Sequence, residues 1–250
     1  MNKNTQVNAA IIIIGNEILS GRTQDTNTST LALWLNSLGV KVQEVRVIPD
    51  IEDVIVNTIN KVRKINNYVF TTGGIGPTHD DITAKSISKA FNVKYEVNKE
   101  AYKILENYYK PGEFNEGRQK MTWTPSNAKL ILNPTSGAPG FIIDNVYCLP
   151  GVPSILKSML GGLKNVISGG KPIISHTINL RTVESEIAKS LTTVQENNKD
   201  VEIGSYPFFR AGKVGVSIVI RSDEQSKIEV CNSQILKFVN QKKIEIIKSS

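Results

Sequence analysis

The stretch that organises the chain is residues 71–83, which read TTGGIGPTHDDIT. A short apolar run, Tyr68-Val69-Phe70, leads into it and predicts a buried strand. Apolar residues spaced along 84–91 follow it and predict an amphipathic helix. A glycine turn between a strand and a helix start leaves backbone N–H groups facing open space, where the helix dipole adds partial positive charge. The stretch therefore predicts a site for an anion, most often a phosphate.

Several residues of this stretch are candidates for contact with a phosphate, because glycine permits positive φ angles and a close approach of the ligand. They are Thr72, Gly73, Gly74, Gly76, Thr78 and Thr83. Two familiar phosphate loops do not fit. No lysine follows Gly76, as the Walker pattern requires, and His79 stands where the dinucleotide pattern has its third glycine.

The acidic pair Asp80-Asp81 is unusual beside a phosphate, because like charges repel. It is explained if a metal ion bridges carboxylate and phosphate, or if a carboxylate takes part in the chemistry. The alternative is structural: Thr78-x-x-Asp81 is a variant of the capping box that starts the next helix. The sequence leaves both interpretations open.

The first half of the chain alternates strands and helices. Strands are predicted over 9–14, 40–48 and 68–72, each followed by a helical pattern, which favours a doubly wound α/β fold with a parallel sheet. Ligands in such folds gather at the carboxyl ends of the strands. Glu17 and Asp50 follow the first two strands and are candidate site carboxylates, with a surface loop acid and a helix N-cap as their structural alternatives.

Other turns add candidate ligand-binding residues. Gly15 follows the first strand, and Asp25 or Asn27 can cap the helix that comes next. A second strand–turn–helix unit at 149–156 can also present N–H groups to an anion. Its candidate residues are Pro150, Gly151, Pro153 and Ser154.

Glycines near residue 170 suggest a boundary between two domains, 1–170 and 171–250. In the first, we expect a helix over 98–110 and a polar loop over 111–118. The second is β-α-β-β-α, a small α+β layer with both helices on one face of its sheet. We expect Thr182 and Asp223 to cap its helices, and a short strand over 201–203.

Composition restricts the class of protein. The net charge of +7 favours acidic partners such as phosphorylated metabolites, and the absence of a dense arginine–lysine block makes nucleic acid unlikely. Cys148 and Cys231 form no CxxC pattern, so we expect neither a disulfide framework nor a zinc site, and we expect a cytoplasmic location. The apolar run at 9–14 is too short for a signal peptide or a membrane helix, so no membrane association is expected.

Five motifs in order make a family resemblance visible. They are residues 15–21 (GNEILSG), 25–27 (DTN), 72–83, 138–141 (APGF) and 149–154 (LPGVPS). Together they resemble the molybdopterin-binding fold of the MoaB/Mog-like proteins of molybdenum-cofactor biosynthesis, of the CinA competence/damage-inducible family and of FAD synthases, with CinA the nearest. The resemblance covers residues 8 to 160. It extends more weakly toward residue 240, where Gly204-Ser205-Tyr206-Pro207 is similar to FAD-synthase-type relatives.

The resemblance implies a three-layer α/β/α domain with a mostly parallel sheet, and a functional pair of aspartates that matches Asp50 and Asp81. Some relatives hydrolyse the pyrophosphate bond of ADP-ribose-like or FAD-like dinucleotides with a metal. It therefore implies a divalent ion such as Mg²⁺ held by Asp50, Asp80 and Asp81, with Glu17 a further candidate. A homo-oligomer is expected. The amidase domain that follows in full-length CinA proteins is not expected, and Asn16 replaces the threonine or aspartate common before the equivalent of Glu17.

Three functions compete on this basis. The first is a metal-dependent pyrophosphatase acting on a nucleotide diphosphate derivative. The second is a binder of molybdopterin or a related phosphorylated ligand that does not turn it over, because a fold does not fix a function. The third is a partner-binding protein with a vestigial pocket. Metal-dependent release of phosphate or AMP separates the first from the others.

Overall fold

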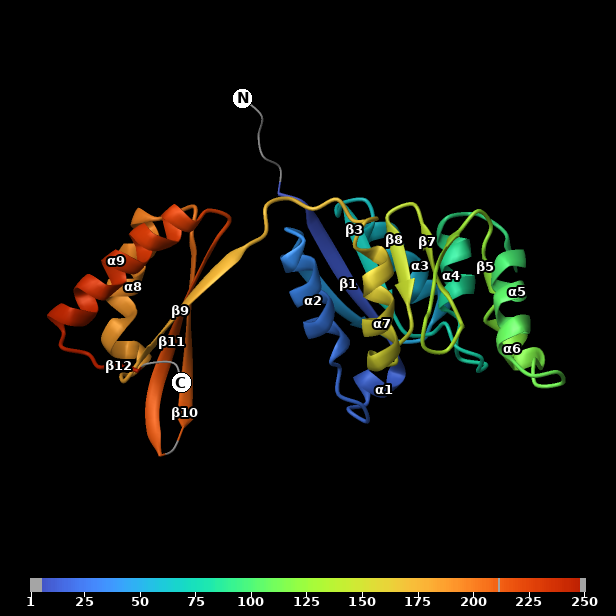
Figure 1. The fold of residues 1–250 in the computed structure, drawn as a ribbon, viewed down its shortest axis with the longest axis horizontal. Helices are drawn as coiled ribbons and strands as arrows, with labels where there is room; N and C mark the ends of the chain where they lie inside the picture. Colours follow the sequence, from blue (N-terminus) through green and yellow to red (C-terminus); the bar gives the residue numbers. More distant parts are fainter. Residues whose placement is uncertain (1–5, 211, 248–250) are drawn as a thin grey trace, which may run out of the picture. The chain divides into compact units, whose positions relative to one another are not determined.

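The computed structural model describes residues 6–210 and 212–247. The chain divides into two compact units, the first ending at Gly170 and the second beginning at Lys171 (Figure 1). Each unit has its own sheet and its own hydrophobic core.

The first unit is built on a six-stranded sheet with the order β2-β1-β3-β8-β7-β6. Its strands are β1 (Asn8–Ile14), β2 (Lys41–Ile48), β3 (Tyr68–Thr72), β6 (Lys129–Ile131), β7 (Gly140–Ile143) and β8 (Val146–Leu149). Strands β2, β1, β3 and β8 are mutually parallel. At one edge, β7 runs antiparallel to β8, and β6 runs antiparallel to β7. The predicted hairpin between β7 and β8 is present, and it turns at Asp144 with a φ of 52°.

Helices cover both faces of this sheet, as the resemblance implies (Figure 1). They are α1 (Asn16–Leu19), α2 (Asn27–Ser37), α3 (Glu52–Val62), α4 (Thr83–Ala90) and α7 (Pro153–Leu163). Alternate residues of β1 enter different cores: Ile11 and Ile13 pack with α2 and α7, while Ile12 and Ile14 pack with α3 and α4. A strand buried on both faces in this way explains the continuous apolar run at 9–14. The prediction of a three-layer α/β fold is confirmed.

Between β3 and the edge hairpin lies a segment that the sequence predicted only in part. Strands β4 (Tyr95–Val97) and β5 (Trp123–Pro125) form a separate antiparallel pair and were not predicted. The expected helix is α5 (Lys99–Tyr108), whose N-cap Asn98 accepts from two backbone N–H groups. The expected loop over 111–118 is wrong at its end. Helix α6 (Glu116–Lys120) begins there because Asn115 accepts from the N–H of Arg118 at 3.1 Å.

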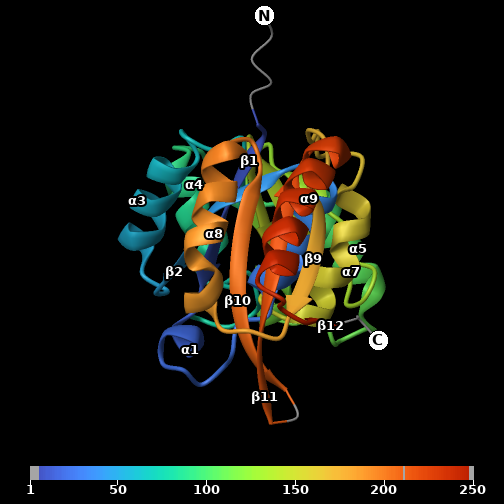
Figure 2. The ribbon, with the colours of Figure 1, turned by 90° about the vertical axis from the view of Figure 1, so that its left-hand side faces the viewer.

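The second unit has a four-stranded sheet with the order β10-β11-β9-β12. Its strands are β9 (Ile174–Leu180), β10 (Glu202–Arg210), β11 (Lys213–Ser222) and β12 (Ile246–Ile247). Figure 2 shows α8 (Glu184–Asn197) and α9 (Gln225–Gln241) side by side on one face of this sheet, as predicted. Their apolar side chains pack on alternate residues of β11, among them Val216, Ile218 and Ile220.

Three local predictions for the second unit are wrong. The strand expected over 201–203 is the nine-residue β10, which extends because it pairs with β11 along its whole length. Val183 and Glu224, rather than Thr182 and Asp223, occupy the N-cap positions, and neither makes a side-chain cap bond. Within the described ranges, no helix is both long and apolar enough to cross a membrane.

The buried centre of β1 gives the first test of this fold. We expect Ile12→Ala to lower the free energy of unfolding of the first unit by about 2–5 kcal/mol, because Ile12 is fully buried between the sheet and two helices. Leu33→Ala is the matched control, since Leu33 is 73% exposed on α2 and should stay within about 0.5 kcal/mol. Urea denaturation measures both, and equal losses would contradict the assignment of the core.

Candidate functional site

The carboxyl ends of four parallel strands place four loops at one edge of the sheet. Gly15, Asp50, Gly73 and Gly151 lie in these loops, after β1, β2, β3 and β8. Backbone bonds tie neighbouring loops together: the N–H of Gly15 donates to Ile48 O at 3.2 Å, and that of Gly73 donates to Leu149 O at 3.1 Å. The edge is therefore one continuous surface of loops, at the position where open α/β sheets bind ligands.

Gly73 lies where two of these loops pack most closely. Its φ is +99°, and a Cβ there would lie 2.1 Å from the carbonyl oxygen of Ile14 at the end of β1. A Cβ on Gly151 would in turn lie 3.4 Å from the Cα of Gly73. The glycine at position 73 is thus required by the neighbouring strand as well as by the backbone conformation.

Thr83 closes the glycine loop from the helix side. Its hydroxyl donates to Gly73 O at 3.0 Å, and its N–H donates to Gly74 O at 2.9 Å. The side chain is fully buried, and Thr72 is 1% exposed. Thr72 and Thr83, both candidates for contact with a phosphate, are thus buried against the glycine loop, and their packing stabilises its conformation.

Asp80 and Asp81 converge on one threonine. The hydroxyl of Thr78 lies 2.5 Å from Asp80 Oδ1 and 2.5 Å from Asp81 Oδ2, and the N–H of Thr78 donates to Asp81 Oδ2 at 2.7 Å. The hydrogen bond from the Thr78 hydroxyl lowers the pKa of Asp80 below its usual value. The Asp81 carboxylate also lies over Gly76, where a Cβ would be 2.7 Å from Asp81 Oδ2.

The capping-box interpretation of Thr78 and Asp81 holds for the hydrogen bond, since Asp81 accepts from the N–H of Thr78 at 2.7 Å, but it is wrong for the helix, which this pair does not start. Helix α4 begins at Thr83, its N-cap is Ile82, and no side chain caps it. Asp81 accepts from the N–H of Thr78 and so braces the loop that precedes the helix. Its conformation is set by the loop.

Asp50 is held by the loop after β1. The N–H of Asn16 donates to Asp50 Oδ2 at 2.9 Å, which joins the loop after β1 to the loop after β2. The N-cap of α3 is Ile51, so the alternative in which Asp50 caps that helix is wrong. Glu17 lies in α1, and its carboxylate folds back toward Gly15, where a Cβ would lie 2.5 Å from Glu17 Oε1.

Asp25 and Asn27 have different tasks. Thr26, rather than Asp25 or Asn27, occupies the N-cap position of α2, but Asp25 Oδ1 accepts from the N–H groups of Asn27 at 2.9 Å and Thr28 at 3.3 Å and so supports the start of the helix. The side-chain amide of Asn27 donates to Gly151 O at 2.7 Å and ties α2 to the turn after β8. Pro150 and Gly151 form that turn, and Pro153 is the first residue of α7. Ser154, the second residue of the helix, is exposed.

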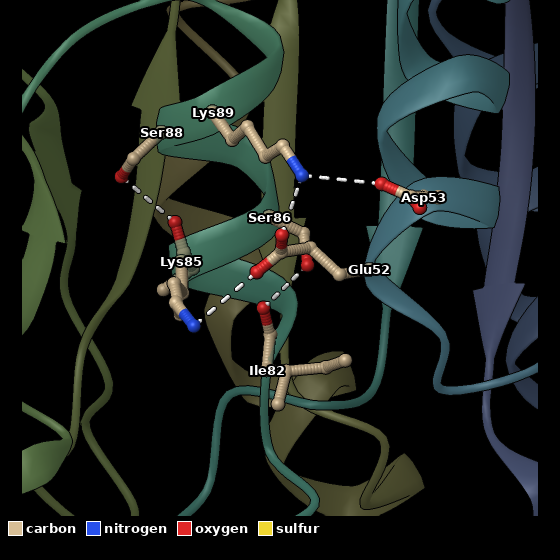
Figure 3. Close-up of polar contacts among 8 residues, drawn as sticks. Glu52, Asp53, Ile82, Lys85, Ser86, Ser88 and Lys89 are labelled. Atoms are coloured by element: carbon tan, nitrogen blue, oxygen red, sulfur yellow. Dashed lines mark hydrogen bonds and ion pairs between the residues drawn. The ribbon is translucent and has the colours of Figure 1, made fainter.

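A cluster of charges joins the two helices that follow the aspartate loops (Figure 3). Lys89 of α4 lies 2.6 Å from Glu52 Oε1 and 3.1 Å from Asp53 Oδ1 at the start of α3, and Lys85 lies 3.3 Å from Glu52 Oε2. Hydrogen bonds from Lys89 and then Lys85 lower the pKa of Glu52. The cluster fixes the start of α3, two residues after Asp50, against the helix that follows Asp81.

The predicted three-carboxylate metal site is not assembled. Among the residues described, no three histidine, cysteine, aspartate or glutamate side chains lie close enough to hold a metal ion. Asp80 and Asp81 meet at Thr78, whereas Asp50 bonds to Asn16. Asp50, Asp80 and Asp81 therefore do not form a group of three, because they come from separately braced loops.

Sequence reasoning missed one wall of the site. Lys120, Tyr95 and Trp123 line a pocket together with Gly74, Gly76 and Asp81. They come from α6 and from the β4–β5 pair, elements of three to five residues with little periodicity. A tryptophan in a polar segment was the available signal, because large aromatic residues outside a predicted core often mark contact surfaces.

Comparison with known proteins places this geometry in a family. Residues 10–176 match the family described as probable molybdopterin binding domain, and residues 172–247 match the middle domain of FAD synthase. The chain belongs to the family of probable molybdopterin-binding domains. The two matches meet near the junction of the two structural units.

Individual proteins are similar to this chain over most of its length. A protein of Archaeoglobus fulgidus is 36% identical over 217 residues, covering 87% of this chain and 92% of its own length. One of Pyrobaculum arsenaticum is 32% identical over 253 residues, covering 96% and 95%. The crystal structure of a CinA protein of unknown function from Thermoplasma acidophilum has a TM-score of 0.62 and 31% identity, covering 66% of this chain and all of that one.

The close packing at Gly73 predicts a cost for any side chain there. We expect Gly73→Ala to lower the free energy of unfolding by about 3 kcal/mol or more, because strained backbone and a clash with Ile14 O add together. Gly21→Ala is the control: its φ is +73°, but no atom lies within 4 Å of the added Cβ. The difference between the two variants in urea denaturation isolates the clash, and similar values for both would contradict it.

The Glu52 cluster predicts a dependence on pH. Because the pKa of Glu52 is lowered in the folded state, its contribution to stability is present above the unfolded pKa of about 4.3 and is lost as the pH falls through the folded value. We expect Glu52→Gln to be slightly less stable than the parent at pH 7, and the difference to shrink as the pH falls below the unfolded value. Thermal melting against pH measures this. A difference that did not change with pH, or that ignored added salt, would assign it to packing instead.

Proposed function

We propose that the edge of the sheet binds a phosphorylated pterin or nucleotide and that Asp50 and Asp81 act on its pyrophosphate bond. The supporting observation is the way the two carboxylates are held. Each is anchored through Oδ2, by Asn16 N–H or Thr78 N–H. The Oδ1 atom of each makes no hydrogen bond to any residue in the described ranges. An anchored carboxylate with one uncommitted oxygen suits a group that accepts a proton from water or holds a cation.

The glycine loop supplies the matching site for the phosphate. Gly73 and Gly74 both have positive φ, and the buried hydroxyl of Thr83 holds the carbonyl of Gly73. The loop is therefore fixed before a ligand arrives, which lowers the entropic cost of binding. The net charge of +7 attracts a phosphorylated ligand in addition.

A divalent ion such as Mg²⁺ fits this proposal if Asp80 and Asp81 hold it. One hydroxyl carries one proton, yet Thr78 Oγ1 lies 2.5 Å from an oxygen of each carboxylate, so two like charges lie side by side where a cation would offset their repulsion. Magnesium is commonly bound by one or two carboxylates, with water and substrate phosphates completing its shell, so a third carboxylate is not required. When bound, the ion would offset the charge of the phosphates and make bound water more acidic.

The proposed reaction is hydrolysis. The oxygen of a water molecule forms a bond to one phosphorus, and the bond from that phosphorus to the bridging oxygen breaks. Two phosphate monoesters result. Asp50 or Asp81 accepts the proton of the attacking water through its uncommitted Oδ1. Binding without turnover is the alternative, favoured by the lack of a three-carboxylate group in the residues described. The homo-oligomer and the cytoplasmic location remain predictions.

The proposal is tested by Asp81→Asn. ADP-ribose, FAD, NAD and coenzyme A are supplied with several divalent ions, and release of the two phosphate monoesters, AMP among them for the first three substrates, is measured. We expect turnover to fall by about 100-fold or more in the variant, the size of a general acid–base contribution. Stability should change by about 0.5 kcal/mol or less, because asparagine still accepts from the N–H of Thr78 and Asp81 caps no helix.

Asp144→Asn is the matched control, since it removes one carboxylate at the hairpin turn between β7 and β8, where asparagine tolerates the positive φ. Its turnover should equal that of the parent. Normal turnover by Asp81→Asn would remove Asp81 from the mechanism. Ligand binding by the parent without product release would favour the binder.

A further inference from the structure

A pocket joins the glycine loop to the β4–β5 pair. Its inner part lies against Gly74, Gly76 and Asp81, and its outer part opens over Glu116 and Gln119 of α6. Tyr95, Lys120 and Trp123 line both parts, so the two hollows share a wall, and the inner one is narrow, with a volume of about 10 Å³. The outer part has a volume of about 370 Å³, within the range of sites for small molecules.

Two aromatic rings form the wall of this pocket. The centroids of Tyr95 and Trp123 lie 5.3 Å apart with the planes tilted by 45°. Trp123 is 40% exposed although tryptophan is among the most costly side chains to leave in water. A single exposed apolar side chain needs no explanation, but here the exposed ring borders a hollow next to a phosphate loop.

Lys120 connects the rings to the loop. Its ammonium donates to the carbonyl oxygen of Thr78, inside the stretch 71–83. It lies near enough to Asp80 to help lower the pKa of that carboxyl, after the hydrogen bond from Thr78. Lys120 makes no ion pair closer than 4 Å with a carboxylate in the described residues, so its charge is available to a phosphate.

We propose that Tyr95 and Trp123 hold the flat heteroaromatic ring of the ligand whose phosphate lies at Lys120 and the glycine loop. The inference rests on the proposed function, because it assigns the other end of the same ligand. Glycine loop, lysine and aromatic rings line two hollows that share a wall, so one ligand can contact all three with its phosphate and its ring, as a nucleotide or a phosphorylated pterin would. Stacking suits either ring, because both present a π face.

The sequence offers a direct reporter for this subsite. The chain has two tryptophans, and Trp34 packs edge-to-face on Phe70 in the first unit. Trp34→Phe therefore leaves Trp123 as the one tryptophan whose fluorescence is observed. We expect AMP and neopterin monophosphate to quench this fluorescence, and ribose 5-phosphate, which has no ring, to leave it nearly unchanged. Whichever of AMP and neopterin monophosphate binds more tightly identifies the kind of ring, purine or pterin, that the subsite prefers.

A second experiment measures ligand affinity by calorimetry in the Trp123→Leu variant. We expect binding of AMP or neopterin monophosphate to weaken by about 5- to 100-fold, the range of base–aromatic stacking. Binding of inorganic pyrophosphate should stay unchanged, because it reaches only Lys120 and the glycine loop. Trp123→Phe keeps an aromatic face and should retain most of the affinity, which separates stacking from a general loss of structure.

The outcomes distinguish this inference from the proposed function. Unchanged affinity for the ring compounds in Trp123→Leu, with pyrophosphate still bound, would overturn the aromatic subsite and leave the phosphate site in place. Equal quenching by AMP and ribose 5-phosphate would overturn it even if Trp123→Leu did not fold. Failure of the parent to bind pyrophosphate, AMP and neopterin monophosphate alike would overturn both.

Discussion

The structure of the site depends on one close approach between neighbouring loops. The backbone of Gly73 passes so near the carbonyl oxygen of Ile14 that even a methyl group would overlap it. This contact brings the loop after β3 against the end of β1, and the bond from Gly73 N–H to Leu149 O brings it against the end of β8. Thr83, Asp81 and Thr78 then complete the loop from within. A phosphate site made of backbone groups is rigid here because the ends of β1 and β8 leave the glycine loop room for one conformation.

The parts of this fold that the sequence predicted are those with long periodic patterns. The run at 9–14 and the helices that alternate with the parallel strands depend on burial, which repeats along the chain and is visible in it. The strands β4 and β5 have three residues each, and α6 has five. Such elements are held by individual bonds, like that of Asn115 to Arg118, and leave no periodic signal. The wall containing Tyr95 and Trp123 was missed for this reason.

For the site residues, too, the sequence predicted some features and missed others. Motif order placed Asp50, Asp81 and the glycines at one edge because parallel strands fix where their carboxyl ends lie. It could not predict that Asp81 accepts from Thr78, nor that Asp50 accepts from Asn16, because these bonds depend on side-chain rotamers within loops. The expected trio of metal ligands did not appear for the same reason. Two loops braced separately deliver their carboxylates to separate partners, Asn16 and Thr78.

The composition of β1 has a consequence for the alignment of the sheet. Four successive isoleucines, Ile11 to Ile14, fill both cores, so sliding the strand by one residue would exchange one isoleucine for another at three of its six buried positions. Burial therefore sets the register less sharply at the centre of the strand than at its ends. Bonds at the strand's end add to it, where Gly15 bonds to Ile48 and Asn16 bonds to Asp50. The loops that carry Gly15, Asn16 and Asp50 therefore also hold the central strand in place, so a substitution there would disturb the alignment of the sheet as well as the loop edge itself.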